Sequence, residues 1–447
     1  MASARRKQRF ISRLPFAKRI SIADSPAAEL HVPAAFRCPI SLDLMKDPVT
    51  LQTGITYDRR SIETWLETGN LTCPVTKQAL KDDDLVPNHS LRRMIQDWCV
   101  AHRSLGIERI PTPRIPVTPA QVLELLSGVS FASRRGHHAR CRELVGNFKA
   151  LGKESERNRR CIVSGGGSRV LSACFSELAT EACEKSRAAL MEDILSALTV
   201  FFPLDQNSCH QLGSHKSVDF IVSVLQSGDL DARLNAVLVL KELVSSLPPE
   251  RIDVLAKTNG LIEALVKLIE KPISPRSTKA ALVAAFHLIT SGEKTAARFV
   301  EMGIIPTVLE AVVDSERSLC EKALAVLDGT LSCSRGREVA YGHALAVPVL
   351  VKKMFRVSEM ATEFAVSALW KLCKNEKKEG GGRGRRGECS REAYQVGGFQ
   401  KLLLLVQVGC NGATKEKVSE LLKLLNGYRA SLECAETMDF RRLKKSF

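Results

Sequence analysis

The sequence predicts a mostly helical protein, with a small mixed α+β module near the N-terminus and a long all-helical repeat region after it. Three observations predict this. The 447 residues exceed the length of one ordinary domain. Apolar residues make up 45% of the chain but aromatic residues only 5%, a balance rich in Leu, Ala and Val that favours helices over a β-sandwich. Helical stretches also recur with a period in the low forties, which is typical of helical solenoids.

The first 31 residues predict a basic, solvated tail. Seven Lys or Arg residues precede the first acidic residue, Asp24, and the segment lacks the apolar core of a secretory signal. A nuclear or anionic-lipid address and an organellar transit peptide are the alternatives. No apolar run reaches the roughly 18 residues of a transmembrane helix.

The fourteen cysteines are scattered along the chain and none has the C-x-x-C spacing. This pattern indicates reduced thiols, mostly buried in apolar runs, rather than a disulfide scaffold. We therefore expect a cytoplasmic protein, with nuclear or membrane association through the basic tail as the alternative.

A small module is expected over residues 32–106. The stretch "DPVTLQTGITYD" alternates polar and apolar residues around Gly54, which predicts a β-hairpin. Asp58 then precedes "RRSIETWLETG" as the expected N-cap of a short helix. A second helix should follow Asn88, with Leu91, Ile95 and Trp98 on one face.

A spacer and a repeat region follow the module. Residues 107–119 form a proline-rich linker, because "RIPTPRIPVTP" carries four prolines in eleven residues and favours extended backbone. Residues 120–430 then repeat a pair of amphipathic stretches, as in "MGIIPTVLEAVV" followed by "RSLCEKALAVLDGTL". The spacing matches the armadillo/HEAT class, with roughly six to seven units. Residues 431–447 are expected to be a C-terminal tail, and the Gly/Arg-rich residues 377–391 a flexible loop.

Zinc is not expected to hold the small module together. A zinc RING module needs about eight Cys or His ligands in pairs around two tetrahedral sites. The candidates here are unpaired: Cys38, Cys73, Cys99, His31, His89 and His102. We therefore interpret Cys38 and Cys73 as small buried hydrophobic residues, and expect no metal and no other cofactor.

Hydrogen bonds are expected to fix the loops of the module instead. Polar side chains able to bond to the backbone stand at turn positions. They are Ser41, Asp43, Asp47, Thr56, Asp58, Thr72 and Thr76.

This arrangement resembles the U-box of plant ubiquitin ligases. The similarity covers "CPISLDLMKDPVTLQTGITYDRRSIETWL", then "CPVT", then "LVPNHSLRRMIQDW", in that order. With the helical repeats, including "ALWKLCKN" and "TKEKVSELLKLLN", most of the chain resembles the plant U-box/armadillo-repeat family. The resemblance implies a zinc-free, RING-like U-box followed by an all-α armadillo solenoid.

The resemblance also implies the activity and the partners. The U-box would bind a ubiquitin-charged conjugating enzyme and promote transfer to a substrate lysine, without a covalent ligase–ubiquitin intermediate. The armadillo repeats would recruit the protein substrate, and the U-box would allow self-association. Carried over residue by residue, the conjugating-enzyme groove would comprise Ile40 and Leu42 in the first loop, Trp65 on the helix and Pro74 in the second loop. The alternative interpretation is that each of these four is an ordinary core residue.

Lys77 follows "CPVT", where the family often places a basic residue that bridges conjugating enzyme and ubiquitin. Arg bonds carboxylates through two parallel hydrogen bonds, whereas Lys is a point charge. The lysine here therefore leaves a ubiquitin-positioning role and a solvated surface role both open.

Two other classes of function compete with the ligase. The alternative is a non-enzymatic armadillo adaptor, similar to an import receptor, whose U-box serves for docking only. An import receptor repeats Trp and Asn residues along its groove, whereas Asn235 has no counterpart in each repeat here. Nucleic-acid binding would rest on the net charge of +16 and the Gly/Arg loop. Lys and Arg are mostly interleaved with Asp and Glu, which indicates diffuse solubilising charge, so no nucleic-acid partner is expected.

Overall fold

The computed structural model describes residues 32–80, 85–105, 107–110, 117–180, 185–379 and 387–443. The chain divides into two units, Met1–Ile115 and Pro116–Phe447. The predicted tail at residues 1–31 and the centre of the Gly/Arg loop, residues 380–386, lie outside the described residues.

The first unit combines a small sheet with two helices. Its elements are η1 (Ala34–Phe36), β1 (Pro48–Thr50), β2 (Thr56–Asp58), α1 (Arg59–Glu67), β3 (Val86–Pro87), α2 (His89–Ala101) and η2 (Arg103–Leu105). The sheet order is β2-β1-β3, with both pairs antiparallel. The hairpin predicted around Gly54 is confirmed, and Gly54 adopts φ +77°, a value that glycine tolerates in a tight turn. The two residues of β3 are too few to produce an alternating pattern.

The core of the first unit lies between the sheet and the helices. Val49 and Tyr57 project from the sheet, Ile62 from α1 and Ile95 from α2, and all four are fully buried. The predicted cap of α2 is confirmed, since Asn88 Oδ1 accepts a hydrogen bond of 2.9 Å from the backbone N–H of Leu91.

The start of the predicted linker belongs to this core. Ile110 is only 4% exposed, and Ile107 packs against the same cluster. The carbonyl oxygen of Ile110 also accepts a hydrogen bond from Gln96 Nε2 on α2. The chain is therefore held against the first unit as far as residue 110, four residues past the boundary expected from the sequence.

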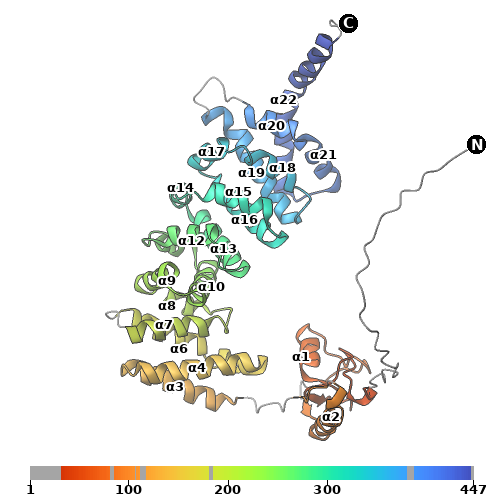
Figure 1. The fold of residues 1–447 in the computed structure, drawn as a ribbon, viewed down its shortest axis with the longest axis vertical. Coiled ribbons are helices and arrows are strands. Elements are labelled where there is room, and N and C mark those ends of the chain that lie inside the picture. Colours follow the sequence, from red (N-terminus) through yellow and green to blue (C-terminus); the bar gives the residue numbers. More distant parts are fainter. Residues whose placement is uncertain are drawn as a thin grey trace, which may run out of the picture. The chain divides into compact units, whose positions relative to one another are not determined.

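The second unit is a stack of helices that follow one another in chain order (Figure 1). They are α3 (Pro119–Arg134), α4 (His138–Glu154), α5 (Glu156–Ser164), α6 (Gly167–Ala179), α7 (Lys185–Leu198), α8 (Gln206–Leu212), α9 (His215–Ser227), α10 (Leu230–Ser246), α11 (Pro249–Leu255), α12 (Leu261–Glu270), α13 (Pro275–Ser291), α14 (Glu293–Glu301), α15 (Ile304–Asp314), α16 (Arg317–Thr330), α17 (Ser334–Tyr341), α18 (Ala346–Lys353), α19 (Glu359–Glu379), α20 (Glu388–Gln395), α21 (Gly398–Val408) and α22 (Gly412–Leu443).

From α5 onward the helices come in groups of three. Each group has a short first helix of 7 to 9 residues, a second helix and a third helix, from α5–α7 to α20–α22. Glycine commonly begins the second helix in a left-handed conformation, as Gly260 does at φ +76°. A Cβ there would lie 2.3 Å from Gln226 Nε2, so the sharp turn requires glycine.

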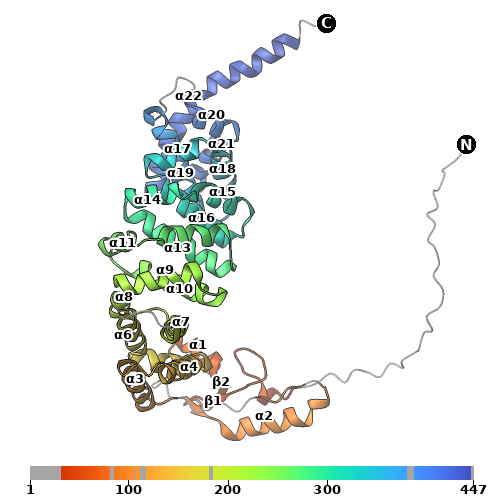
Figure 2. The same cartoon turned by 60° about the vertical axis from the view of Figure 1, so that its left-hand side comes forward.

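The third helices form a continuous layer. Helix α4 contacts α7, and contacts continue through α10, α13, α16 and α19 to α22. One apolar core runs through the whole stack. Figure 2 shows that α22 extends beyond its neighbours α20 and α21. This long helix continues to Leu443, past residue 430, where the sequence placed the end of the repeats.

The predicted amphipathic pairs correspond to the second and third helices, for example α15 with α16. The short first helices were not predicted, because a stretch of 7 to 9 residues gives too few turns for its periodicity to be recognised.

Candidate functional site

Two loops of the first unit share one conformation. In residues 38–44, the N–H of Cys38 donates to the carbonyl of Asp43 and the N–H of Leu42 donates to the carbonyl of Cys38. In residues 73–79, the N–H of Cys73 donates to the carbonyl of Gln78, and the N–H of Lys77 donates to the carbonyl of Cys73. Each loop is closed by an antiparallel bridge, Arg37 with Leu44 and Thr72 with Ala79. The second loop thus repeats the first at an offset of 35 residues.

This shared turn displays the residues predicted to bind a partner. Leu42 and Lys77 occupy the same place in the two loops, at φ +62° and +59°. Such values are unusual outside glycine, and strain of this kind concentrates at functional sites. Leu42 is 68% exposed, which makes it surface rather than core. Ile40 and Pro74 are half-buried within the two loops.

Val75 is a candidate that the sequence analysis missed. It is 52% exposed and holds the place in the second loop that Ile40 holds in the first. The signal was present, since "CPIS" and "CPVT" are parallel quartets 35 residues apart.

Trp65 joins helix α1 to the second loop. Its ring nitrogen donates a 2.8 Å hydrogen bond to the carbonyl of Thr72, which fixes the half-buried indole beside the loop. The ammonium of Lys77 lies 5.8 Å from the centre of the same ring, within range of a cation–π contact. The structure therefore brings Trp65 and Lys77 together.

Asp58 anchors the segment that follows the first loop through side-chain-to-backbone hydrogen bonds, as expected from the sequence. The residue stands at the N-cap of α1, but its side chain makes no capping bond there. Asp58 Oδ1 instead accepts hydrogen bonds from the backbone N–H groups of Lys46, at 2.7 Å, and Asp47, at 2.9 Å. Asp58 is therefore the N-cap residue that the sequence predicts, but its carboxylate bonds two N–H groups across the hairpin in place of a capping N–H.

Charged side chains extend this anchor across the unit. Asp47 accepts from Arg59 Nε of α1 at 2.7 Å and from Arg92 Nη1 of α2 at 3.4 Å. All three side chains are at most 22% exposed, so solvent screens these ion pairs less than it would surface pairs. Together they tie both helices to the segment that follows the first loop.

The two loop cysteines are buried as predicted, but they are not merely small hydrophobic residues. Cys38 Sγ accepts a hydrogen bond of 3.3 Å from the backbone N–H of Asp58. Cys73 Sγ accepts one from Thr53 Oγ1 at 3.3 Å and shares a 3.0 Å bond with Tyr57 Oη. Donors therefore surround each sulfur, and the thiols help to fix the loops.

These donors change the acidity of Cys73. Burial raises the pKa of its thiol, but hydrogen bonds from Thr53, Thr76 and Tyr57 outweigh that effect and lower the pKa to about 6. For Cys38, burial also raises the pKa of the thiol. Backbone hydrogen bonds at Ser41, Asp58 and Ile40 outweigh that effect, so the pKa lies below its usual value. Within the described residues, no three His, Cys, Asp or Glu side chains are grouped so that they could hold a metal ion.

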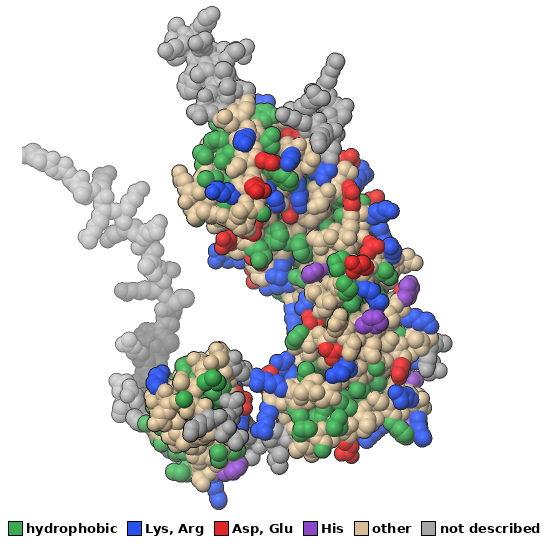
Figure 3. All heavy atoms as spheres, turned by 180° about the vertical axis from the view of Figure 1, so that it is seen from behind, with side chains coloured by type: hydrophobic (Ala, Val, Ile, Leu, Met, Phe, Trp, Pro, Cys, Tyr) green, Lys and Arg blue, Asp and Glu red, His purple; other side chains and the backbone are tan. Residues whose placement is uncertain are grey.

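The second unit presents polar and apolar side chains on its third helices. Lys371 of α19 pairs with Asp328 of α16 at 2.8 Å, with both side chains at most 16% exposed. Trp370 Nε1 donates to Glu420 of α22 at 2.7 Å, and Lys374 lies 4.3 Å from the Trp370 ring centre. On the face shown in Figure 3, basic and acidic side chains are intermixed over the surface of this unit.

Comparison with known proteins identifies the family. A family model for the U-box domain matches residues 32–104, and one for the plant U-box protein ARM repeat region matches residues 121–445. U-box domain-containing protein 21 of Arabidopsis thaliana is 41% identical over 424 residues, covering 94% of each chain. E3 ubiquitin-protein ligase PUB23 of the same plant is 34% identical, covering 89% of this chain and 93% of its own.

A designed armadillo repeat protein of known structure aligns with 56% of this chain and 98% of its own, at 17% identity and a TM-score of 0.44. In the described part of the chain, no helix is both long and apolar enough to span a membrane. The two family models together cover both units, and the relatives match nearly the whole length. The resemblance inferred from the sequence is therefore confirmed, and the chain belongs to the plant U-box proteins with an ARM repeat region, a family that includes E3 ubiquitin-protein ligases.

Proposed function

We propose that this chain is a ubiquitin-protein ligase, whose U-box binds a ubiquitin-charged conjugating enzyme and whose repeats recruit the protein substrate. One observation carries the first part of the proposal. Two hydrogen-bonded loops of the same conformation, the second of them joined to Trp65 of α1, hold apolar side chains at the surface of the U-box. Relatives that match most of the chain are named E3 ubiquitin-protein ligases, which supports the activity.

The apolar groove is formed by Ile40, Leu42, Trp65 and Pro74, with Val75 added from the structure. The left-handed backbone at Leu42 and Lys77 fixes how the loops present these side chains. A fixed surface loses little conformational freedom on binding, so more of its contact energy appears as affinity. Burial of one such side chain against the partner contributes about 1.5–3 kcal/mol.

The U-box acts by orientation. It supplies no nucleophile, and transfer passes directly from the thioester of the conjugating enzyme to a lysine amine. Holding the reacting groups in one geometry lowers the entropic part of the barrier. Lys77 lies against Trp65 at the edge of the groove, so its ammonium can reach an acidic or carbonyl oxygen of ubiquitin while the enzyme occupies the loops.

The repeats serve substrate recruitment, because a continuous layer of third helices gives an extended surface for a protein segment. We assign residues 32–110 to the U-box, 111–118 to the linker and 119–443 to the repeats, and propose self-association through the U-box. The cysteines in the described residues are all free thiols, which supports a reducing, cytoplasmic location.

The test is a reconstituted reaction with activating enzyme, a panel of conjugating enzymes and labelled ubiquitin. Leu42→Ala and Ile40→Ala should slow discharge of the conjugating enzyme about ten- to a hundredfold. Their melting temperatures should stay within a few degrees of the wild type. Met94→Ala is the matched control, because Met94 is 57% exposed on α2, outside the loops.

Two results would overturn the proposal. Wild-type protein that binds a conjugating enzyme but never discharges it would favour the adaptor function. Loop variants that discharge at the wild-type rate would place the binding surface elsewhere on the U-box.

A further inference from the structure

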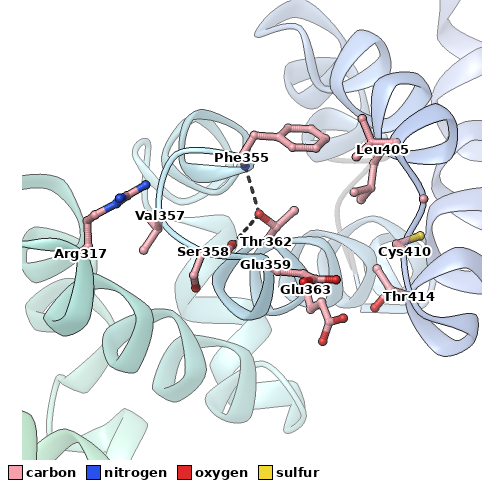
Figure 4. Close-up of a pocket in the computed structure, with 12 residues that line it drawn as sticks. Arg317, Phe355, Val357, Ser358, Glu359, Thr362, Glu363, Leu405, Cys410 and Thr414 are labelled. Carbon is pink, nitrogen blue, oxygen red and sulfur yellow. Dashed lines mark hydrogen bonds between the residues drawn. The ribbon is translucent and has the colours of Figure 1, made fainter. Parts of the chain in front are cut away.

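A pocket of about 420 Å³ lies between the last two repeats, at the ends of their third helices. One wall is the connection between α18 and α19, residues 354–358, and another is the connection between α21 and α22, residues 409–411. The side chains that give its lining charge and apolar character include Arg317, Phe355, Glu359, Glu363, Leu405 and Val408. Figure 4 shows the side chains that border it.

Phe355 forms an apolar wall of the pocket, and its backbone adopts a strained conformation there. Its φ is +66°, a left-handed value that is unfavourable for an aromatic residue and that such residues rarely adopt. The N–H of Phe355 donates a 3.1 Å hydrogen bond to Thr362 Oγ1, which in turn donates to the carbonyl of Ser358. Yet the ring is not buried, since Phe355 remains 40% exposed. The strained turn therefore holds an aromatic ring at the mouth of a pocket.

The opposite wall is also apolar. Leu405 of α21 faces Phe355 across the pocket (Figure 4). Val408, at the end of the same helix, is 69% exposed. Leu405 itself is only 6% exposed, so the apolar surface that solvent reaches is that of Phe355 and Val408.

Two carboxylates form the floor. Glu359 and Glu363 lie one turn apart on α19, and their carboxylates project below the space between Phe355 and Leu405 (Figure 4). Glu363 also accepts a hydrogen bond from Asn411 Nδ2, which fixes its side chain. Arg317 lies at the other end of the pocket, so the negative charge is concentrated at one end.

We propose that this pocket binds an arginine side chain from an extended segment of a protein partner. The proposal rests on the recruiting role assigned to the repeats and names the partner's chemistry. The three methylene groups of arginine match the apolar walls, and the guanidinium can stack on Phe355 while it bonds the carboxylates. Its planar fork suits carboxylates better than an ammonium does.

The probes are pools of fluorescein-labelled heptapeptides with degenerate flanks and a fixed central residue: arginine, its neutral analogue citrulline, or lysine. Fluorescence polarisation measures their binding to the full-length protein, without conjugating enzyme or ubiquitin. The arginine pool should bind at least tenfold more tightly than the citrulline pool. The double variant Glu359→Gln, Glu363→Gln should lose this preference, while an amide oxygen at position 363 can still accept from Asn411.

Glu310→Gln is the matched control, because Glu310 is exposed on α15 and does not line the pocket. Phe355→Gly is a second variant that the backbone accepts without strain. It should melt no earlier than the wild type and still bind the arginine pool at least tenfold more weakly.

The proposal is overturned if no pool binds, if arginine and citrulline pools bind alike, if the double glutamine variant keeps the arginine preference, or if Phe355→Gly binds the arginine pool as tightly as the wild type. A lysine pool equal to the arginine pool would overturn the assignment to arginine. Autoubiquitination by the pocket variants should be unchanged. Failed peptide binding beside intact autoubiquitination therefore refutes the pocket alone, and absent wild-type ligase activity refutes the proposed function alone.

Discussion

The hydroxyl of Tyr57 lies 3.0 Å from the sulfur of Cys73, and both side chains are fully buried. The same hydroxyl accepts a 3.3 Å hydrogen bond from the backbone N–H of Val75. One phenol on strand β2 therefore holds both the buried base and the exposed residue of the second loop. Its partners are supplied by residues 16 and 18 positions further along the chain.

The stability of the U-box should rise with pH between about pH 6 and pH 9. The folded thiol of Cys73 has a pKa of about 6, against 9.0 for an ordinary thiol. Between these values the unfolded chain binds the extra proton, so raising the pH favours the folded state, and the contribution is lost as pH falls through 6. Urea unfolding followed by tryptophan fluorescence at pH 6, 7 and 8 measures this. Cys73→Ser should flatten the trend, and an unchanged trend would assign it to another group.

Asp58→Ala should destabilise the U-box by about 1–3 kcal/mol, because two backbone N–H groups lose their acceptor. The first loop should loosen with it, so discharge of the conjugating enzyme should fall as well. Thermal unfolding and discharge are measured on the same preparation. Asp97→Ala, at an exposed position on α2, is the control and should change neither. Equal behaviour of the two variants would contradict the anchoring role of Asp58.

Chelators should leave both the melting temperature and the ligase activity unchanged. Side-chain and backbone hydrogen bonds at Cys38, Asp58 and Cys73 already fix the loops. The protein is incubated with EDTA and phenanthroline, and its metal content is measured before and after by mass spectrometry. Stoichiometric zinc that leaves together with activity would refute this expectation.

A fragment of residues 32–112 should fold alone and be more stable than a fragment of residues 32–106. The longer fragment keeps Ile110, which is only 4% exposed, and its hydrogen bond with Gln96. Burying one isoleucine contributes about 1.5–3 kcal/mol. Ile110→Ala in the longer fragment should remove most of the gain. Equal denaturation midpoints for the two lengths would show that residues 107–110 do not stabilise the U-box.

The hairpin, the cap at Asn88 and the repeated helices were predictable because each depends on local chemistry. Gly54 permits the turn, Asn88 supplies a capping oxygen, and apolar residues at helical spacing recur in the repeats. These signals need only neighbouring residues, so a single sequence contains them.

The anchors of the loops were less accessible from the sequence. Asp58 is the N-cap residue expected from the sequence, but its carboxylate makes no capping bond, because its donors lie 11 and 12 residues earlier, across the hairpin. The donors to Cys73 come from Thr53 and Tyr57, 20 and 16 residues away. The pocket at Phe355 likewise depends on loops from two repeats, and the left-handed backbone of that residue has no signature in the sequence.

The stacking of the third helices also determines how the repeat region opens. Helix α22 contacts α19, α20 and α21, whereas helices in the middle of the stack have a repeat on each side. A terminal repeat with one neighbour should fray first, and its amides should exchange hydrogen faster than those of α13 or α16. The pocket at Phe355 joins this terminal repeat to the one before it. A peptide bound there would contact both repeats and reduce fraying of the terminal one, so partner binding would slow hydrogen exchange in α22.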